Sequence, residues 1–240
     1  MRTYLFIAFI CLLSCKEVKK ANTEFTDKYK PDADSSFVIK NITDSIEAIT
    51  KEGNIVFRGG TDVESNIIRD FSYTDKLFSH CGIALNTDSG MVVAHMLGGT
   101  DNPDGGILFQ KIKTFLRYPD NESGGIYELN ITKQEIDKFH LYADSIKNNK
   151  IGFDIKFDLF TKNMLYCTEM LADGLSLVKN EKDFIKPTAF NLKNTKYFFL
   201  ANSKDSFLFY PIDKFQHNKL LTEKKIFHFP NFGRNIITFN

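Results

Sequence analysis

The sequence contains no tryptophan and only four cysteines among its 240 residues. Four cysteines in a chain of this length are too few for a disulfide scaffold. None of them forms a CxxC pair or a Cys/His pair with the spacing of a structural zinc site. No Walker-type loop and no GxGxxG segment is present. We therefore expect neither a metal ion nor an organic cofactor.

The sequence also lacks an excess of charge of either sign. Its 31 Lys and Arg residues balance 30 Asp and Glu residues, giving a formal net charge of +1. A near-neutral chain has no broad electrostatic attraction to nucleic acid, so we expect no nucleic-acid partner. Hydrophobic residues make up 42% of the chain, with 24 Phe and 9 Tyr. This composition predicts a folded, phenylalanine-rich core rather than a disordered chain.

The amino terminus has the pattern of an export signal. Arg2 precedes an apolar run over 4–13, which is too short to span a bilayer but suits a signal peptide. The run ends in Leu12-Leu13-Ser14-Cys15, which resembles a bacterial lipobox whose cysteine is lipidated. We expect a lipoprotein signal peptide over 1–14, a polar tether over 15–36 and one domain over 37–240. Cys15 then anchors the protein to a bacterial membrane in the cell envelope; the alternative is an ordinary signal peptide with an incidental cysteine.

Residue periodicity predicts one α+β domain. Helices are expected over 37–51, 61–71, 110–117, 132–148 and 165–178, with capping boxes at Thr61–Glu64 and Thr132–Glu135. Strands are expected over 54–60, 125–130, 197–201, 207–210 and 225–229, and 79–85 and 91–96 form a hairpin. The glycine-rich segment 98–106 is expected to be a solvated loop, and the aromatic run 207–211 to pack in the core rather than to line an apolar cleft.

Alternation along the first hairpin strand separates two candidate catalytic residues. His80, Gly82 and Ala84 share one face, whereas Cys81 lies on the other face with bulky apolar residues. The small residues beside His80 leave room for a partner to approach it. Cys81 is expected to be a buried hydrophobe rather than a nucleophile.

Cys167 lies where an extended stretch enters a helix. The first turn of a helix presents unpaired N–H groups and the positive end of its dipole, and both favour a thiolate. The same groups can bind an oxyanion. The alternative interpretation is a core cysteine on a helix.

Four segments together resemble the permuted papain-like hydrolases of the NlpC/P60 superfamily, specifically the YaeF/YiiX-type group. They are GNIVFR at 53–58, FSHCGI at 78–83, VVAH at 92–95 and YCTEM at 166–170. His80 precedes Cys167 by 87 residues, which is the order of the permuted arrangement. Asn54 stands where the group commonly has Asp, and Cys81 where it usually has Val. The resemblance implies a circularly permuted papain-like fold, with a small antiparallel sheet packed against helices.

The resemblance also implies covalent acyl transfer by a monomer. Cys167 is the expected nucleophile, its backbone N–H an oxyanion donor, and His80 the base. His95 is the expected third residue; Glu169 is a weaker alternative, because its position two residues after Cys167 favours a helix-anchoring role. The expected substrate is an amide or peptide bond in peptidoglycan-type cell-wall peptides. A lipid acyl hydrolase or acyltransferase, and a non-catalytic envelope binding protein, stay as alternatives.

Overall fold

A computed structural model describes residues 33–161, 163–182, 184–192, 195, 197 and 206–230. The chain divides into Met1–Phe37 and a second compact unit, Val38–Asn240, and the packing below is that of the second unit. The predicted signal peptide, Cys15 and the tether as far as residue 32 lie outside the described residues. Within the described part of the chain, no helix combines the length and the apolar character needed to cross a membrane.

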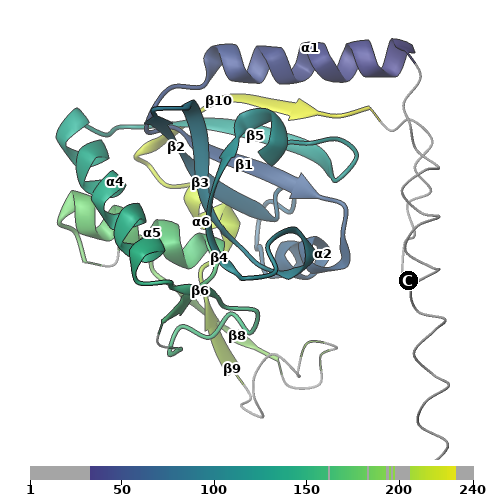
Figure 1. Cartoon of the computed structure of the whole chain (residues 1–240). Helices are drawn as coiled ribbons and strands as arrows, with labels where there is room; N and C mark the ends of the chain where they lie inside the picture. Colours follow the sequence, from purple (N-terminus) through teal and green to yellow (C-terminus); the bar gives the residue numbers. More distant parts are fainter. Residues whose placement is uncertain are drawn as a thin grey trace, which may run out of the picture. The chain divides into compact units, whose positions relative to one another are not determined.

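Six strands form one antiparallel sheet in the order β10-β5-β1-β2-β3-β4 (Figure 1). Their bounds are β1 Ile55–Gly60, β2 His80–Thr87, β3 Gly90–Leu97, β4 Gly106–Lys111, β5 Asn121–Leu129 and β10 Leu221–His228. Two small sheets pair β6 Gly152–Phe153 with β7 Met164–Leu165, and β8 Thr188–Asn191 with β9 Ser206–Phe209. The helices are α1 Ala33–Ile49, α2 Val63–Asp70, α3 Ile112–Phe115, α4 Lys133–Asn148, α5 Cys167–Lys179 and α6 Ile212–Gln216, with a 3-10 turn η1 at Gly99–Asp101.

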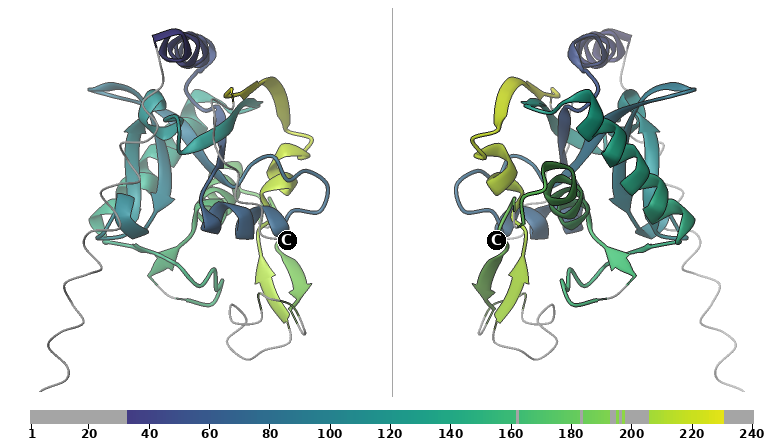
Figure 2. Two further views of the ribbon diagram at one scale, coloured as in Figure 1. Left: turned by 90° about the vertical axis from the view of Figure 1, so that its right-hand side faces the viewer. Right: turned by 90° about the vertical axis from the view of Figure 1, so that its left-hand side faces the viewer.

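Each face of the large sheet has its own hydrophobic cluster. The period-two alternation of the strands sends Phe57 and Ile83 to the face covered by α4 and α5 (Figure 2). Val56 and Val93 point to the opposite face, where Ile46 of α1 and residues of α3 cover them. The sheet is therefore buried on both sides, and residues that are adjacent in one strand face different environments. This confirms an α+β fold with an antiparallel sheet packed against helices.

Most of the predicted elements are present, with shifted boundaries. The hairpin of β2 and β3, the capping box of Thr132 and Glu135 and the apolar stripe of α1 are confirmed. The first helix begins at Ala33, within the predicted tether. The second is capped by Asp62 rather than Thr61, because the Asp62 carboxylate accepts the Ser65 N–H. The predicted strand at 197–201 falls almost entirely outside the described residues.

The region after the glycine-rich loop differs from the prediction. Residues 106–111 form the edge strand β4, and only 112–115 are helical where a helix over 110–117 was expected. The side chains of β4 are mostly half-buried, so the segment has no clear alternation for the sequence to reveal. Strand β8 and helix α6 were also not expected from the sequence.

A third hydrophobic cluster is mostly aromatic and holds the start of α5. Phe209 stacks on Tyr166 with their ring centroids 5.1 Å apart, and both rings are buried. The Tyr166 hydroxyl accepts the backbone N–H of Tyr210 at 3.0 Å. The predicted core role of the 207–211 segment is thus confirmed. Since Tyr166 immediately precedes α5, this cluster fixes the point at which the helix begins.

Phe209→Ala tests how much the aromatic cluster contributes to stability. Removing a fully buried phenylalanine leaves a cavity, so the free energy of unfolding should fall by about 3–5 kcal/mol. Urea unfolding of the full chain measures this loss. Leu177→Ala is the control, because that side chain is 59% exposed on α5 and its loss should cost less than about 1 kcal/mol. Equal effects of the two changes would contradict a packing role for Phe209.

Candidate active site

The candidate site lies where strands β2 and β3 separate. The two strands pair only from Thr87 and Gly90 as far as Ile83 and Ala94, although β2 begins at His80. In the separated part, His80 and His95 project from the same face, with the Nε2 of His80 2.8 Å from the Nδ1 of His95. The strand separation thus brings together the two histidines that the sequence singled out.

Gly82 allows this approach. A Cβ placed on Gly82 would lie 2.9 Å from the Cβ of His95 and 2.6 Å from the Cγ1 of Val93. Any side chain at this position would push β3 away from β2. The room predicted beside His80 is therefore occupied by the neighbouring strand that carries His95.

Gln110 on β4 sets the protonation pattern of the two imidazoles. Its Oε1 lies 3.1 Å from the Nε2 of His95, so this nitrogen carries the proton that it donates. The Nδ1 of His95 is then an acceptor for the Nε2–H of His80. His80 is left with an unprotonated Nδ1, the nitrogen that can take a proton from a reacting group. Sequence analysis missed Gln110, because only the β3–β4 register brings it beside His95.

Burial keeps both imidazoles uncharged. His80 is 9% exposed and His95 is fully buried, and the Phe115 ring packs against each of them. Burial lowers the pKa of His95 to about 3, and the positive charge of Arg58 acts in the same direction. The pKa of His80 is also well below its usual value, through burial, Arg58 and His95. Both rings are therefore neutral near pH 7.

Cys167 is the first residue of α5 and is 4% exposed. Its pKa is lowered mainly because the Cys81 thiol donates a hydrogen bond to its sulfur, and the backbone N–H groups of Cys81 and Thr168 add to this. Burial acts in the opposite direction but does not prevail. The contact from the Thr168 N–H agrees with the sequence prediction that the start of this helix stabilises a thiolate. The contacts from Cys81 lower the pKa of Cys167 further.

These contacts also locate the sulfur relative to the histidines. Cys81 follows His80, and because β2 and β3 no longer pair here, the Cys81 N–H is available to the sulfur. The Cys167 thiol therefore lies beside the backbone of Cys81, the residue that follows His80. Among the described residues, no hydrogen bond joins the Cys167 thiol to an imidazole; the imidazoles pack against Phe115 instead. Cys81 itself is fully buried, as predicted.

Arg58 supplies the positive charge of the site. It lies opposite His80 in the β1–β2 register, and its Nη1 donates to the Phe115 carbonyl at 2.9 Å. The guanidinium also stacks over the Phe115 ring, 4.7 Å from its centroid. No carboxylate in the described ranges lies within ion-pair distance of it, and its charge lowers the pKa of the Cys167 thiol. Arg58 is not among the site residues expected from the sequence; an arginine that ends a buried apolar run is the signal that could have identified it.

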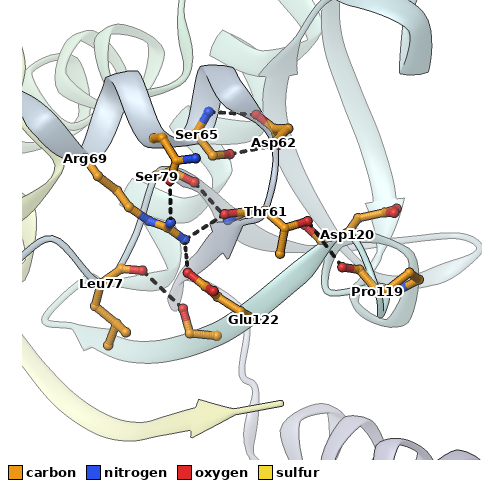
Figure 3. A network of polar contacts seen from close by, with 12 residues as sticks. Thr61, Asp62, Ser65, Arg69, Leu77, Ser79, Pro119, Asp120 and Glu122 are labelled. Atoms are coloured by element: carbon orange, nitrogen blue, oxygen red, sulfur yellow. Dashed lines mark hydrogen bonds and ion pairs between the residues drawn. The ribbon is translucent and has the colours of Figure 1, made fainter. Parts of the chain in front are cut away.

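A polar network fixes the residue that precedes His80 (Figure 3). The Ser79 hydroxyl accepts the backbone N–H of Gly60 at 2.9 Å, and Arg69 donates to the Gly60 carbonyl at 2.7 Å. Arg69 also forms a 2.6 Å ion pair with Glu122 on β5. The network ties the end of β1 to the start of β2 and to β5, so the position at which β2 begins is held by contacts from β1 and from β5, the strand on the other side of β1.

Glu169 lies on another side of α5. Its carboxylate accepts the Tyr166 N–H at 3.3 Å, which agrees with the helix-anchoring role that the sequence favours. Burial, followed by the nearby Asp173, raises its pKa to about 8. Glu169 borders a pocket of about 380 Å³ together with residues of α4 and of the segment before α5. Cys167, His80 and His95 do not line this pocket, so it does not mark the reaction centre.

Comparisons with known proteins give one kind of match. No protein-family model and no curated protein sequence matches this chain. Among solved structures, the metalloprotein YiiX from Escherichia coli O157:H7 is similar, with a TM-score of 0.54 and 14% sequence identity. The match covers 73% of this chain and 96% of YiiX. It confirms, at the level of the fold, the YiiX-type resemblance that the motifs indicated.

Arg58→Gln tests the electrostatic support of the thiolate. Because the cation lowers the pKa of Cys167, removing it should raise that pKa and reduce the thiolate present at low pH. We expect iodoacetamide to alkylate Cys167 about 3- to 10-fold more slowly at about pH 6, with the rates converging as pH rises. Mass spectrometry of the peptide 163–179 follows the reaction.

Lys133→Gln is the matched control, since its cation is exposed on α4. It should leave the alkylation rate unchanged. Equal rates for the wild type and Arg58→Gln at low pH would show that Arg58 does not act on the thiol.

Proposed function

We propose that this protein, which shares the fold of YiiX, is a thiol hydrolase that cleaves an amide or peptide bond through a covalent acyl-enzyme. The observation that carries the proposal is the relay from Gln110 through His95 to His80, beside the lowered-pKa thiol of Cys167. Nucleophilic acyl transfer requires a base with an unprotonated nitrogen, a polar group that orients this base, and an activated nucleophile. We further propose that the domain is a permuted papain-like fold that acts as a monomer.

In this mechanism the sulfur of Cys167 attacks the carbonyl carbon, and the Nδ1 of His80 takes the thiol proton. The backbone N–H of Cys167 and the cation of Arg58 stabilise the negative charge that develops on the carbonyl oxygen. His80 then delivers the proton to the leaving amine as the carbon–nitrogen bond breaks. In the second half, His80 deprotonates a water molecule, which attacks the thioester and releases the acid and the thiol.

Peptides of the cell-wall type are the first candidate substrates. They carry carboxylates, and the Arg58 guanidinium, which has no carboxylate partner among the described residues, suits an anionic group near the scissile carbonyl. The predicted lipidation of Cys15 would also hold the enzyme in the cell envelope, close to such peptides. A lipid acyl ester is the second candidate, because Ile155 and Phe160, in the segment that leads to α5, are 73% and 71% exposed. Exposed apolar side chains of this kind suit an acyl chain.

YiiX is described as a metalloprotein, which raises the question of whether the residues of this chain could hold a metal ion. The described residues contain no group of three or more His, Cys, Asp or Glu side chains that could bind one. The facing nitrogens of His80 and His95 are hydrogen-bonded to each other, and the Cys167 sulfur accepts from Cys81 and Thr168. The residues present do not fit a metal centre, and the proposed mechanism contains no metal-dependent step.

Hydrolysis of defined substrates tests the proposal. The full chain is incubated with muropeptides or with phospholipid vesicles, and the products and any acyl adduct on peptide 163–179 are read by mass spectrometry. We expect peptide cleavage with an adduct on Cys167, no reaction for Cys167→Ala, and a loss of about 10²- to 10⁴-fold for His80→Ala.

His140→Ala is the matched histidine control, because His140 lies on α4 and contacts Glu52 rather than a residue of the site, and it should retain activity. Cleavage of vesicle lipid alone would favour the lipid acyl hydrolase. Binding of muropeptide without turnover or adduct would contradict an enzyme and favour an envelope binding protein.

Gln110→Leu tests the relay on which the mechanism rests. Without the Gln110 acceptor, His95 is free to adopt the other tautomer and to leave His80 with its Nδ1 protonated. We expect kcat to fall about tenfold or more with little change in KM, since the substrate does not contact Gln110. Gln110→Glu keeps an acceptor and should recover activity, and ¹⁵N NMR of the imidazoles should show the tautomer change. Normal kcat in Gln110→Leu would contradict the relay.

A further inference from the structure

The two thiols of the domain lie in one buried cluster at the interface between β2 and α5. Cys81 belongs to the same cluster as Cys167, because alternation along β2 turns it toward α5 while His80 faces away. Each thiol shifts the pKa of the other, with Cys81 as the hydrogen-bond donor and Cys167 as the acceptor, and both cysteines are free.

We propose that Cys81 and Cys167 are an oxidation site, which closes to a reversible disulfide when the protein meets a hydroperoxide. The proposal goes beyond hydrolysis: it concerns a covalent modification of the chain itself. Only its consequence, the masking of the nucleophile, rests on the proposed function.

The geometry favours bond formation. A disulfide needs a sulfur–sulfur distance of about 2.05 Å and Cα atoms on elements that already face each other. The two thiols interact inside one buried cluster, and β2 and α5 pack directly on one another. Bond formation then requires the two sulfurs to approach to the covalent distance.

The first chemical step is attack of the Cys167 thiolate on the hydroperoxide. A sulfur–oxygen bond forms, the oxygen–oxygen bond breaks, and hydroxide or alkoxide leaves, so the sulfur is oxidised by two electrons to a sulfenic acid. Arg58 and the Thr168 N–H support the thiolate form of Cys167, whereas burial and its neighbour raise the pKa of Cys81. Cys167 is therefore the residue that reacts first.

The second step is attack of Cys81 on the sulfur of the sulfenic acid. The disulfide bond forms, the sulfur–oxygen bond breaks, and the oxygen leaves as water with the proton of the Cys81 thiol. Conversion of Cys167 to a sulfenic acid removes the negative charge that contributes to the raised pKa of Cys81. Oxidation of one thiol thus makes the other more reactive. A dithiol reductant reverses the bond.

The test uses the full chain with Cys11→Ser and Cys15→Ser, so that only Cys81 and Cys167 carry thiols. The protein is treated with hydrogen peroxide, digested with trypsin without reduction and analysed by mass spectrometry. We expect a linked product of peptides 77–111 and 163–179, which contain Cys81 and Cys167. Dithiothreitol should release both peptides and restore iodoacetamide labelling of Cys167.

Cys81→Val is the matched variant, because valine keeps an apolar side chain of similar size at this buried position. In it, peroxide should carry Cys167 on to sulfinic and sulfonic acids, and dithiothreitol should recover at least about tenfold less reactive thiol than in the wild type. Near-ultraviolet circular dichroism checks that the variant is folded.

The proposal would be overturned if wild-type Cys167 were oxidised to sulfinic acid while Cys81 stayed a free thiol. It would also be overturned if dithiothreitol recovered the same amount of reactive Cys167 thiol in the wild type and in Cys81→Val. Because the readout is the mass of the peptides, it does not depend on hydrolytic activity. A protein that forms the disulfide but cleaves no substrate would contradict only the proposed function.

Discussion

The separation of β2 from β3 is the constraint on which the site depends. Paired strands use every second N–H in the ladder, and a continued ladder would occupy the Cys81 N–H and hold His95 in regular register. Because pairing ends at Ile83 and Ala94, that N–H is available to the Cys167 sulfur and His95 can reach His80. One break in the sheet therefore assembles a site from three elements: two strands and the first turn of α5.

Burial determines which groups of this site carry a charge: the two imidazoles are neutral and Arg58 is positive. In a thiolate–imidazolium pair, the histidine carries the positive charge that stabilises the thiolate. Here burial and Arg58 keep both imidazoles neutral, so the hydrogen bond from Cys81, the nearby backbone N–H groups and the charge of Arg58 lower the pKa of the thiol in place of an imidazolium. This arrangement explains why Arg58 is held by the carbonyl and ring of Phe115 rather than by a carboxylate, since an ion pair would neutralise the charge that the thiol needs.

The sequence predicts the features that depend on local periodicity. Alternation at 79–85 predicts the burial of Cys81 and the space beside His80, and the entry into a helix at Cys167 predicts the donors around its sulfur. The features that it misses depend on which strands become neighbours. Gln110 reaches His95 only through the register of β3 with β4, an edge strand with no clear alternation, and Arg58 faces His80 only through the register of β1 with β2. The N-terminal predictions, including Cys15, fall outside the described residues.

The nucleophile and the base are held by different parts of the core. The imidazoles lie against Phe115 on the face of the sheet covered by α1 and α3. The start of α5 is held instead by Tyr166 in the aromatic cluster and by the Glu169 carboxylate that accepts the Tyr166 N–H. Because the two sets of contacts share no side chain, the position of the thiol and the position of the His80–His95 pair are determined by separate parts of the core.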